Sequence, residues 1–121
     1  MVIPLLSLLI FLDGATTHLV VASGRGYEGN PLAVGADPVL SSALLAALVL
    51  PLSFIKARRF LAVFFAPHLA VRAVTVVHNL SVYLFGVNLV SLWWPLAAPL
   101  FLTAWSVAVT SVWLIRYRRL F

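Results

Sequence analysis

Four long apolar stretches alternate with short polar segments along this chain. They cover about residues 2–22, 38–55, 60–85 and 92–115. Each is long enough for a transmembrane α-helix, which takes about 17–25 residues to cross the hydrocarbon core of a bilayer. The pattern predicts an all-α fold with a single domain over residues 1–121, an integral membrane bundle of four transmembrane helices.

The composition agrees with this pattern. Hydrophobic residues make up 64% of the chain and charged residues 9%, and the mean hydropathy is +1.12. A soluble domain is about 45–50% apolar and about 25% charged. We therefore predict a multi-pass protein of the cell membrane whose main partner is the lipid bilayer.

The first apolar stretch differs from a secretory signal peptide. It has no Lys or Arg before its apolar run, and Asp13 interrupts that run. Signal peptides combine a positively charged start with an unbroken apolar segment. We expect this stretch to be a retained transmembrane helix.

Basic residues cluster after the second and the fourth apolar stretches and give the chain a net charge of +5. Because cytoplasmic loops of membrane proteins carry the excess of Lys and Arg, both termini are expected in the cytoplasm. The loop over residues 23–37 and the Gly86-Val87-Asn88 turn then lie outside. Since this clustering accounts for the positive charge, we predict no nucleic-acid partner. The clustered residues are Lys56, Arg58, Arg59, Arg116, Arg118 and Arg119.

Prolines mark positions where the helices start or bend. Pro38 suits the first turn of the second helix. Pro51 is expected to bend that helix near its cytoplasmic end, and Pro67 to kink the third helix. A proline inside a helix also frees the backbone carbonyl one turn earlier.

Two opposite charges lie near the middle of predicted helices. Asp13 is in the first helix and Arg72 in the third. A charge at the bilayer centre costs about 2.5–3.5 kcal/mol on insertion scales. We predict an ion pair between these side chains. It serves either to fix the register of the two helices or to form a site that binds or conducts a solute.

Polar residues follow a helical spacing around this pair. On an ideal helix, His68, Arg72, Thr75 and Asn79 fall within about 60° of one another. Asp13, Thr16 and Thr17 share a face of the first helix, and a Ser/Thr face recurs on the fourth. These stripes predict a polar interior between the first, third and fourth helices. The almost wholly apolar second helix would then face lipid, a second copy of the chain or a larger membrane complex.

The first loop carries the pattern Gly-x-x-Glu28-x-Asn30-Pro31, in which Asn30 and Pro31 suit a helix start. Together with Asp13-x-x-x-Thr17, this pattern resembles a family of small uncharacterised archaeal and bacterial polytopic membrane proteins. Their signature is an Asp and a Thr in the first helix followed by Glu-x-Asn-Pro. The match covers about the first third of the chain. The resemblance implies that Asp13, Thr17, Glu28, Asn30 and Pro31 act as one unit.

No nucleotide-binding, hydrolase or metalloprotease motif occurs in the sequence. The three histidines are poorly spaced for a shared ion, so we predict no catalytic residue, no metal and no cofactor. The candidate site comprises Asp13, Thr17, Glu28, Asn30, His68, Arg72, Thr75 and Asn79.

Three functions remain open. The pattern favours a small non-enzymatic membrane protein with a polar intramembrane site, acting as an accessory or structural membrane component. The first alternative is a small oligomeric transporter or channel-like protein that passes protons or a small polar or anionic solute. The second is an intramembrane enzyme.

Overall fold

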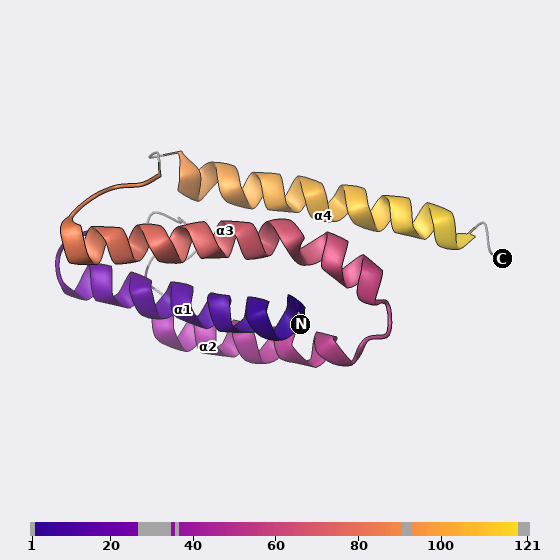
Figure 1. Cartoon of the computed structure of the whole chain (residues 1–121), viewed down its shortest axis with the longest axis horizontal. Coiled ribbons are helices and arrows are strands. Elements are labelled where there is room, and N and C mark those ends of the chain that lie inside the picture. Colours follow the sequence, from indigo (N-terminus) through magenta and orange to yellow (C-terminus); the bar gives the residue numbers. More distant parts are fainter. Residues whose placement is uncertain (1, 27–34, 36, 91–92, 119–121) are drawn as a thin grey trace.

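The chain is helical in the computed structural model, which describes residues 2–26, 35, 37–90 and 93–118. The helices are α1 (Val2–Ala22), α2 (Pro38–Val49), α3 (Arg58–Phe85) and α4 (Trp94–Arg118), and a 3₁₀ helix η1 (Leu50–Phe54) follows α2 (Figure 1). No strand occurs in the described ranges, so the all-α prediction is confirmed. By length and composition, α1, α3 and α4 could each cross a membrane, which is compatible with a multi-pass membrane protein.

The second predicted helix is not one continuous α-helix over residues 38–55. Its α-helical part ends at Val49, and five residues continue as the 3₁₀ helix η1. Pro51 explains the change, because it has no N–H for the carbonyl four residues earlier. The helix type changes at the position where a bend is expected, and α2 is shorter than predicted.

Local signals set the start of α2 and the end of α3. Asp37 caps α2: its Oδ1 accepts from the backbone N–H groups of Val39 and Leu40, at 2.9 and 3.0 Å. Pro38 follows as the first helical residue, as predicted. At the end of α3, Gly86 takes a left-handed conformation with φ of 68°. Glycine tolerates this conformation without steric cost, which explains the sharp exit from α3.

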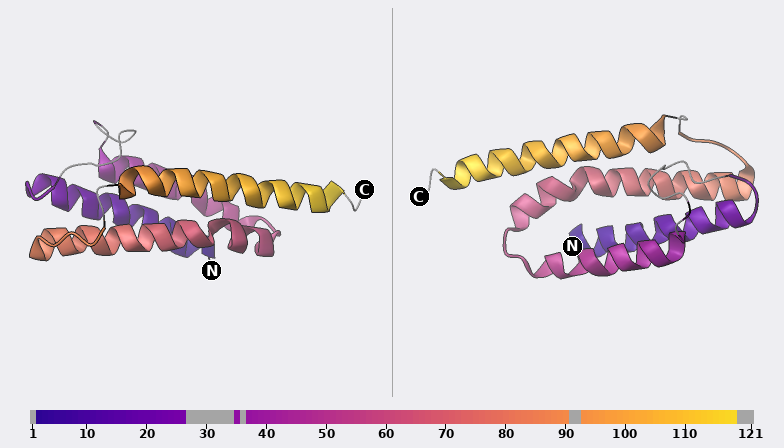
Figure 2. Two further views of the ribbon diagram at one scale, coloured as in Figure 1. Left: turned by 90° about the horizontal axis from the view of Figure 1, so that it is seen from above. Right: turned by 180° about the vertical axis from the view of Figure 1, so that it is seen from behind.

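The helices lie in the order α2, α1, α3, α4 across the molecule (Figures 1 and 2). α1 packs between α2 and α3, whereas α4 contacts α3 alone among the described helices. α1 and α4 share no direct packing contact among the described residues, so α3 lies between them in the predicted grouping of the first, third and fourth helices. Since α2 packs against α1, one face of α2 is covered within the chain.

An apolar core fills one half of the bundle. Leu6 and Ile10 of α1 meet Ala46 of α2, and partly buried Val49, Phe65 and Leu69 pack around them. These residues come from the start of α1, the end of α2 and the start of α3. The same half of the α3–α4 contact is aromatic, with the rings of Phe60 and Trp113 at a centroid distance of 5.1 Å. This half of the molecule is the end that carries the α2–α3 turn.

Pro67 lies inside α3, which bends in its first half (Figure 1). The carbonyl freed by Pro67 belongs to Val63, and Nε1–H of Trp105 in α4 donates to it at 3.0 Å. An unpaired carbonyl in hydrocarbon would cost several kcal/mol. The carbonyl freed at the expected kink thus accepts a hydrogen bond from the next helix, and this bond helps to attach α4 to α3.

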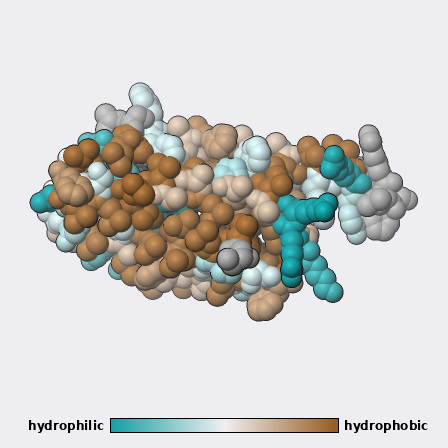
Figure 3. Space-filling view, in the orientation of Figure 1, coloured by the Kyte–Doolittle hydropathy of each residue, from teal (hydrophilic) through white to brown (hydrophobic). Residues whose placement is uncertain are grey.

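The surface is mainly hydrophobic along the helices. Hydrophilic side chains gather at the end with the α2–α3 turn (Figure 3). Exposed leucines and phenylalanines cover the outer faces, including Leu48 of α2 and Leu100 of α4 at 74% and 73% exposure. Such faces suit a lipid environment and are rare on soluble proteins.

Candidate functional site

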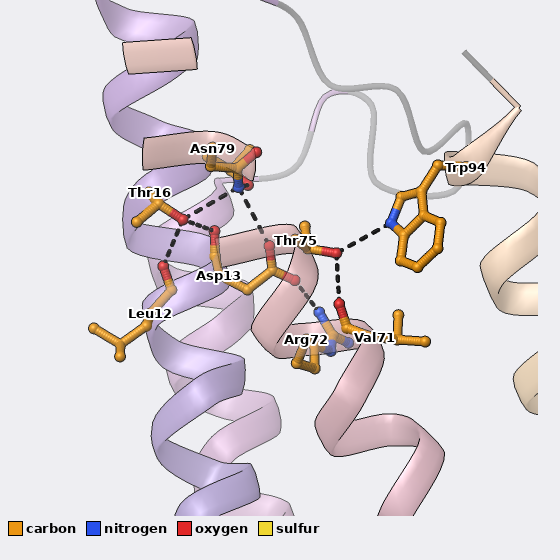
Figure 4. Close-up of polar contacts among 9 residues, drawn as sticks. Leu12, Asp13, Thr16, Val71, Arg72, Thr75, Asn79 and Trp94 are labelled. Atoms are coloured by element: carbon orange, nitrogen blue, oxygen red, sulfur yellow. Dashed lines mark hydrogen bonds and ion pairs between the residues drawn. The ribbon is translucent and has the colours of Figure 1, made fainter. Parts of the chain in front are cut away.

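The predicted pair of charges is an ion pair in the structure. Nη1 of Arg72 in α3 donates to Oδ2 of Asp13 in α1 (Figure 4). The Asp13 side chain is 13% exposed and that of Arg72 is 33% exposed. The carboxylate is therefore enclosed between the helices, while the guanidinium also faces open space.

Asn79 extends this contact by two turns of α3. Its Nδ2 donates to the hydroxyl oxygens of Thr16 and Thr17, both at 3.1 Å, and lies 3.5 Å from Oδ1 of Asp13. An amide nitrogen carries two N–H donors, so the two threonines take both and the aspartate contact is the weakest. The cluster joins four of the predicted polar residues across the α1–α3 contact: Asp13, Thr17, Arg72 and Asn79.

Thr75 belongs to the same stripe but turns towards α4. Nε1–H of Trp94 donates to its hydroxyl oxygen at 3.2 Å, and that hydroxyl donates to the carbonyl of Val71 at 2.9 Å (Figure 4). Through this bond the indole of Trp94 links the start of α4 to the polar stripe of α3.

His68 bonds α4 and does not reach Asp13. Its Nε2 lies 3.1 Å from the Ser106 hydroxyl, which donates to the carbonyl of Leu102 at 2.7 Å. Since that hydroxyl has only one hydrogen, His68 donates from Nε2. His68 therefore attaches α4 to α3 at one end of the stripe.

The polar side chains of α3 bond two different helices because α3 packs between α1 and α4. On an ideal helix, Thr75 and His68 lie about 20–60° around the axis from Asn79 and Arg72. The first two residues bond α4 and the other two bond α1. One polar face of α3 thus bonds both α1 and α4, which share no direct packing contact among the described residues.

A cavity of about 810 Å³ opens beside this face. Its walls come from all four α-helices, and the polar lining includes Asp13, Arg72, Thr75 and Asn79. Ser41 and Ser42 of α2 and Trp94 of α4 also line it. Arg25 and Asn88 line the end away from the α2–α3 turn, where the α1–α2 and α3–α4 connections lie. The volume falls in the ~300–1,000 Å³ range typical of small-molecule sites.

The apolar core limits this cavity on the other side. Ile10 is the residue nearest the start of α1 that lines it, and Leu6 one turn earlier is 1% exposed within the core. Buried apolar side chains therefore lie between the polar cluster and the end with the α2–α3 turn. Among the described residues, this apolar core bounds the cavity on the side of the α2–α3 turn.

A close approach of α1 and α2 supports the cavity wall. A Cβ atom added to Gly14 would lie 1.8 Å from Oγ of Ser42 and 2.3 Å from the carbonyl oxygen of Pro38. Only glycine fits between these helices. Sequence reasoning did not single out Gly14, although a glycine inside a membrane helix is a known signal for close helix packing.

The remaining predicted residues, Glu28 and Asn30, lie outside the described residues, as does Pro31. Their part in the site stays a prediction. In the described ranges, no three His, Cys, Asp or Glu side chains gather in a way that could hold a metal ion. His78, which lines the cavity, accepts from the backbone N–H of Leu89 through Nδ1 at 3.1 Å.

Comparison with protein families, curated proteins and solved structures finds no match for this chain. The resemblance based on Asp13, Thr17 and the Glu-x-Asn-Pro loop therefore stays a prediction. The geometry of the site itself has to carry any statement about function.

Proposed function

We propose that this chain is a small non-enzymatic integral membrane protein that binds a small polar or anionic solute in an outward-facing cavity. In this proposal four helical segments cross the bilayer and both termini are cytoplasmic. The carrying observation is the cavity of about 810 Å³ that has the Asp13–Arg72 ion pair in its wall. A pair that only fixed the register of α1 and α3 would not need an opening beside it.

The depth of the ion pair supports an intramembrane site. Asp13 is the twelfth of the 21 residues of α1, and Arg72 is the fifteenth of the 28 of α3. Both charges therefore lie near the helix centres. Ionisable residues at this depth usually mark solute or ion pathways, because their insertion is costly.

The length of α2 with η1 supports a fourth crossing. Twelve α-helical residues extend about 18 Å at 1.5 Å per residue. The five 3₁₀ residues add about 10 Å at 2.0 Å per residue. The segment Pro38–Phe54 thus comes close to the ~30 Å hydrocarbon thickness. The change in helix type partly offsets the small number of residues.

The distribution of charge supports the orientation. Lys56, Arg58 and Arg59 follow η1, and Arg116 lies near the end of α4. The N-terminus of α1 and the C-terminus of α4 lie towards the same end of the bundle (Figure 1). The positive-inside rule assigns that end to the cytoplasm. The cavity mouth near Arg25 and Asn88 then faces outwards.

Single-cysteine labelling tests this orientation, because the chain has no cysteine of its own. We expect Asn88→Cys to react with a membrane-impermeant maleimide in intact cells, since Asn88 lies in the exposed outer turn. Lys56→Cys, in the exposed α2–α3 turn, should react only after the cells are permeabilised. The reverse labelling pattern would contradict the orientation.

Filling the cavity tests solute binding. Ala98 of α4 is 7% exposed and lines the cavity, whereas its neighbour Ala97 is exposed. We expect native mass spectrometry of the gently extracted protein to show a bound small molecule. Ala98→Phe should lose that mass because the ring occupies the cavity, and Ala97→Phe should keep it. A wild-type protein without a bound mass, or its retention by Ala98→Phe, would contradict the proposal.

An accessory role in a larger membrane complex is the second candidate. Its supporting observation is that α4 contacts only α3 among the described helices, with most of its apolar surface uncovered. A second chain could therefore pack on α4 without disturbing the ion pair. Co-purification of one partner in constant stoichiometry would favour this function over an autonomous binding protein.

A further inference from the structure

We infer that the ligand of this cavity is an amphipathic organic anion, a carboxylate or phosphate ester on an apolar body. Its anionic group would bind the free N–H groups of Arg72. This inference rests on the proposed function and deepens it, because it assigns a chemical class to the solute.

The guanidinium is the charge available to a ligand. Arg72 carries five N–H donors, and one of its nitrogens bonds Asp13. No other acceptor for its side chain occurs among the described residues. The Asp13 carboxylate, by contrast, contacts both Arg72 and Asn79 and is largely enclosed. A planar guanidinium with free donors matches carboxylate and phosphate geometry.

The net charge of the cavity lining also favours an anionic ligand. Among the described residues that line the cavity, Arg25 and Arg72 are cationic and Asp13 alone is acidic. Asp13 offsets one of these two positive charges, so the described lining keeps a net positive charge that favours an anion, and Arg25 contributes to it at the end of the cavity away from the α2–α3 turn. Clefts lined by one sign of charge concentrate ligands of the opposite sign.

The apolar part of the cavity wall matches a ligand with an apolar body. Side chains from every helix contribute apolar surface, and one apolar ligand could contact several of them at once. The apolar lining residues include Val20, Leu45, Val71, Val82, Ala98 and Leu102.

In this inference a lipid-soluble ligand enters between α2 and α4. α2 and α4 both contribute to the lining, but they do not contact each other. Leu45 of α2 and Leu102 of α4 thus line one cavity from two helices that share no direct packing contact among the described residues. An anion with an apolar chain could reach Arg72 from the bilayer through this side, or from water past Arg25.

Binding of radiolabelled decanoate tests this inference. The protein is placed in phosphatidylcholine nanodiscs, and empty nanodiscs correct for partition into lipid. We expect saturable binding of one decanoate per chain. Unlabelled decanoate should displace it at least tenfold better than decanol or decyltrimethylammonium, which match its chain length but lack the anion. Displacement by inorganic phosphate would identify an anion that arrives from water. Displacement by decanoate without phosphate would identify one that arrives from the bilayer.

Variants assign the binding to Arg72. The double change Asp13→Asn with Arg72→Gln keeps a polar pair and should weaken decanoate binding at least tenfold. Arg72→Lys keeps the charge but not the fork of donors, and it should weaken binding about threefold or more. The matched control is Arg58→Gln, an exposed arginine at the other end of α3, which should change binding less than twofold.

Two results separate this inference from the proposed function. If decanol and decyltrimethylammonium displace labelled decanoate as well as decanoate itself does, the cavity binds ligands without recognising anions. That result overturns the inference and leaves the binding function standing. If no saturable decanoate binding occurs while the wild-type protein retains another bound mass, the inference is again wrong. If both measurements show no ligand, both proposals fail.

Discussion

Replacing Arg72 by leucine should lower the stability of this protein by about 3 kcal/mol, the lower end of the range for breaking a buried ion pair. The change leaves the Asp13 carboxylate enclosed between α1 and α3 without a charged partner, with the Thr17 hydroxyl and the weak Asn79 contact remaining. We take the lower end because the Arg72 side chain is one-third exposed to the cavity. Unfolding in detergent micelles, followed by circular dichroism, would measure the loss.

The reciprocal change Asp13→Leu should cost less than Arg72→Leu. It leaves an arginine whose long side chain already reaches the cavity, so the charge can stay hydrated. An equal or larger cost for Asp13→Leu would show that the cavity does not hydrate Arg72. A smaller cost for Asp13→Leu than for Arg72→Leu therefore indicates a site that is open to water, and equal costs indicate an ion pair that is shielded from water.

The double change Asp13→Asn with Arg72→Gln should recover most of the stability, because no unpaired charge remains and two amides can hydrogen-bond. Arg58→Leu, at an exposed position near the start of α3, is the matched control and should stay within about 0.5 kcal/mol of the wild type. A double variant as unstable as Arg72→Leu would mean that the charges themselves are required for folding.

Much of the fold was predictable because hydropathy alone determines where membrane helices lie. The predicted range 2–22 matches α1, and the ends of α3 differ from 60–85 by no more than two residues. The second helix was less predictable. Its apolar run continues through Pro51, so composition could not show that α-helix changes to 3₁₀ helix there. The backbone chemistry of proline supplied that signal.

Helical periodicity identified the members of the polar stripe but not their partners. His68, Arg72, Thr75 and Asn79 share a face, yet which neighbouring helix each one meets depends on where α1 and α4 lie around α3. The sequence of one helix does not specify how the neighbouring helices are arranged around it. Opposite charge did predict the Asp13–Arg72 partners, because few other charges were available at that depth.

Two contributors to the site carried weak sequence signals. Trp94 donates from its indole to Thr75, and no motif or helical spacing in the sequence indicates that contact. Trp105 supplies the donor for the carbonyl freed by Pro67. The kink was predictable, whereas the donor was not, because it comes from a helix 42 residues away in sequence.

Substituting Gly14 by alanine should destabilise the protein by about 3 kcal/mol or more, at or above the upper end of the usual cost of overpacking. Alanine normally stabilises a helix by about 1 kcal/mol relative to glycine, so the sign of the effect is diagnostic. The added Cβ would meet the carbonyl oxygen of Pro38 at 2.3 Å as well as the Ser42 side chain. A backbone atom cannot move aside unless α2 shifts away from α1.

A second change separates the two clashes at Gly14. Ser42→Gly removes the contacts with Oγ and Cβ of Ser42, but the carbonyl of Pro38 stays in place. The Gly14→Ala, Ser42→Gly double variant should therefore recover only part of the stability. Ala47→Leu, on the exposed face of α2, adds more volume and should stay within about 0.5 kcal/mol of the wild type. A stable Gly14→Ala protein would contradict the close approach of α1 and α2, and with it the cavity wall formed by Ser41 and Ser42.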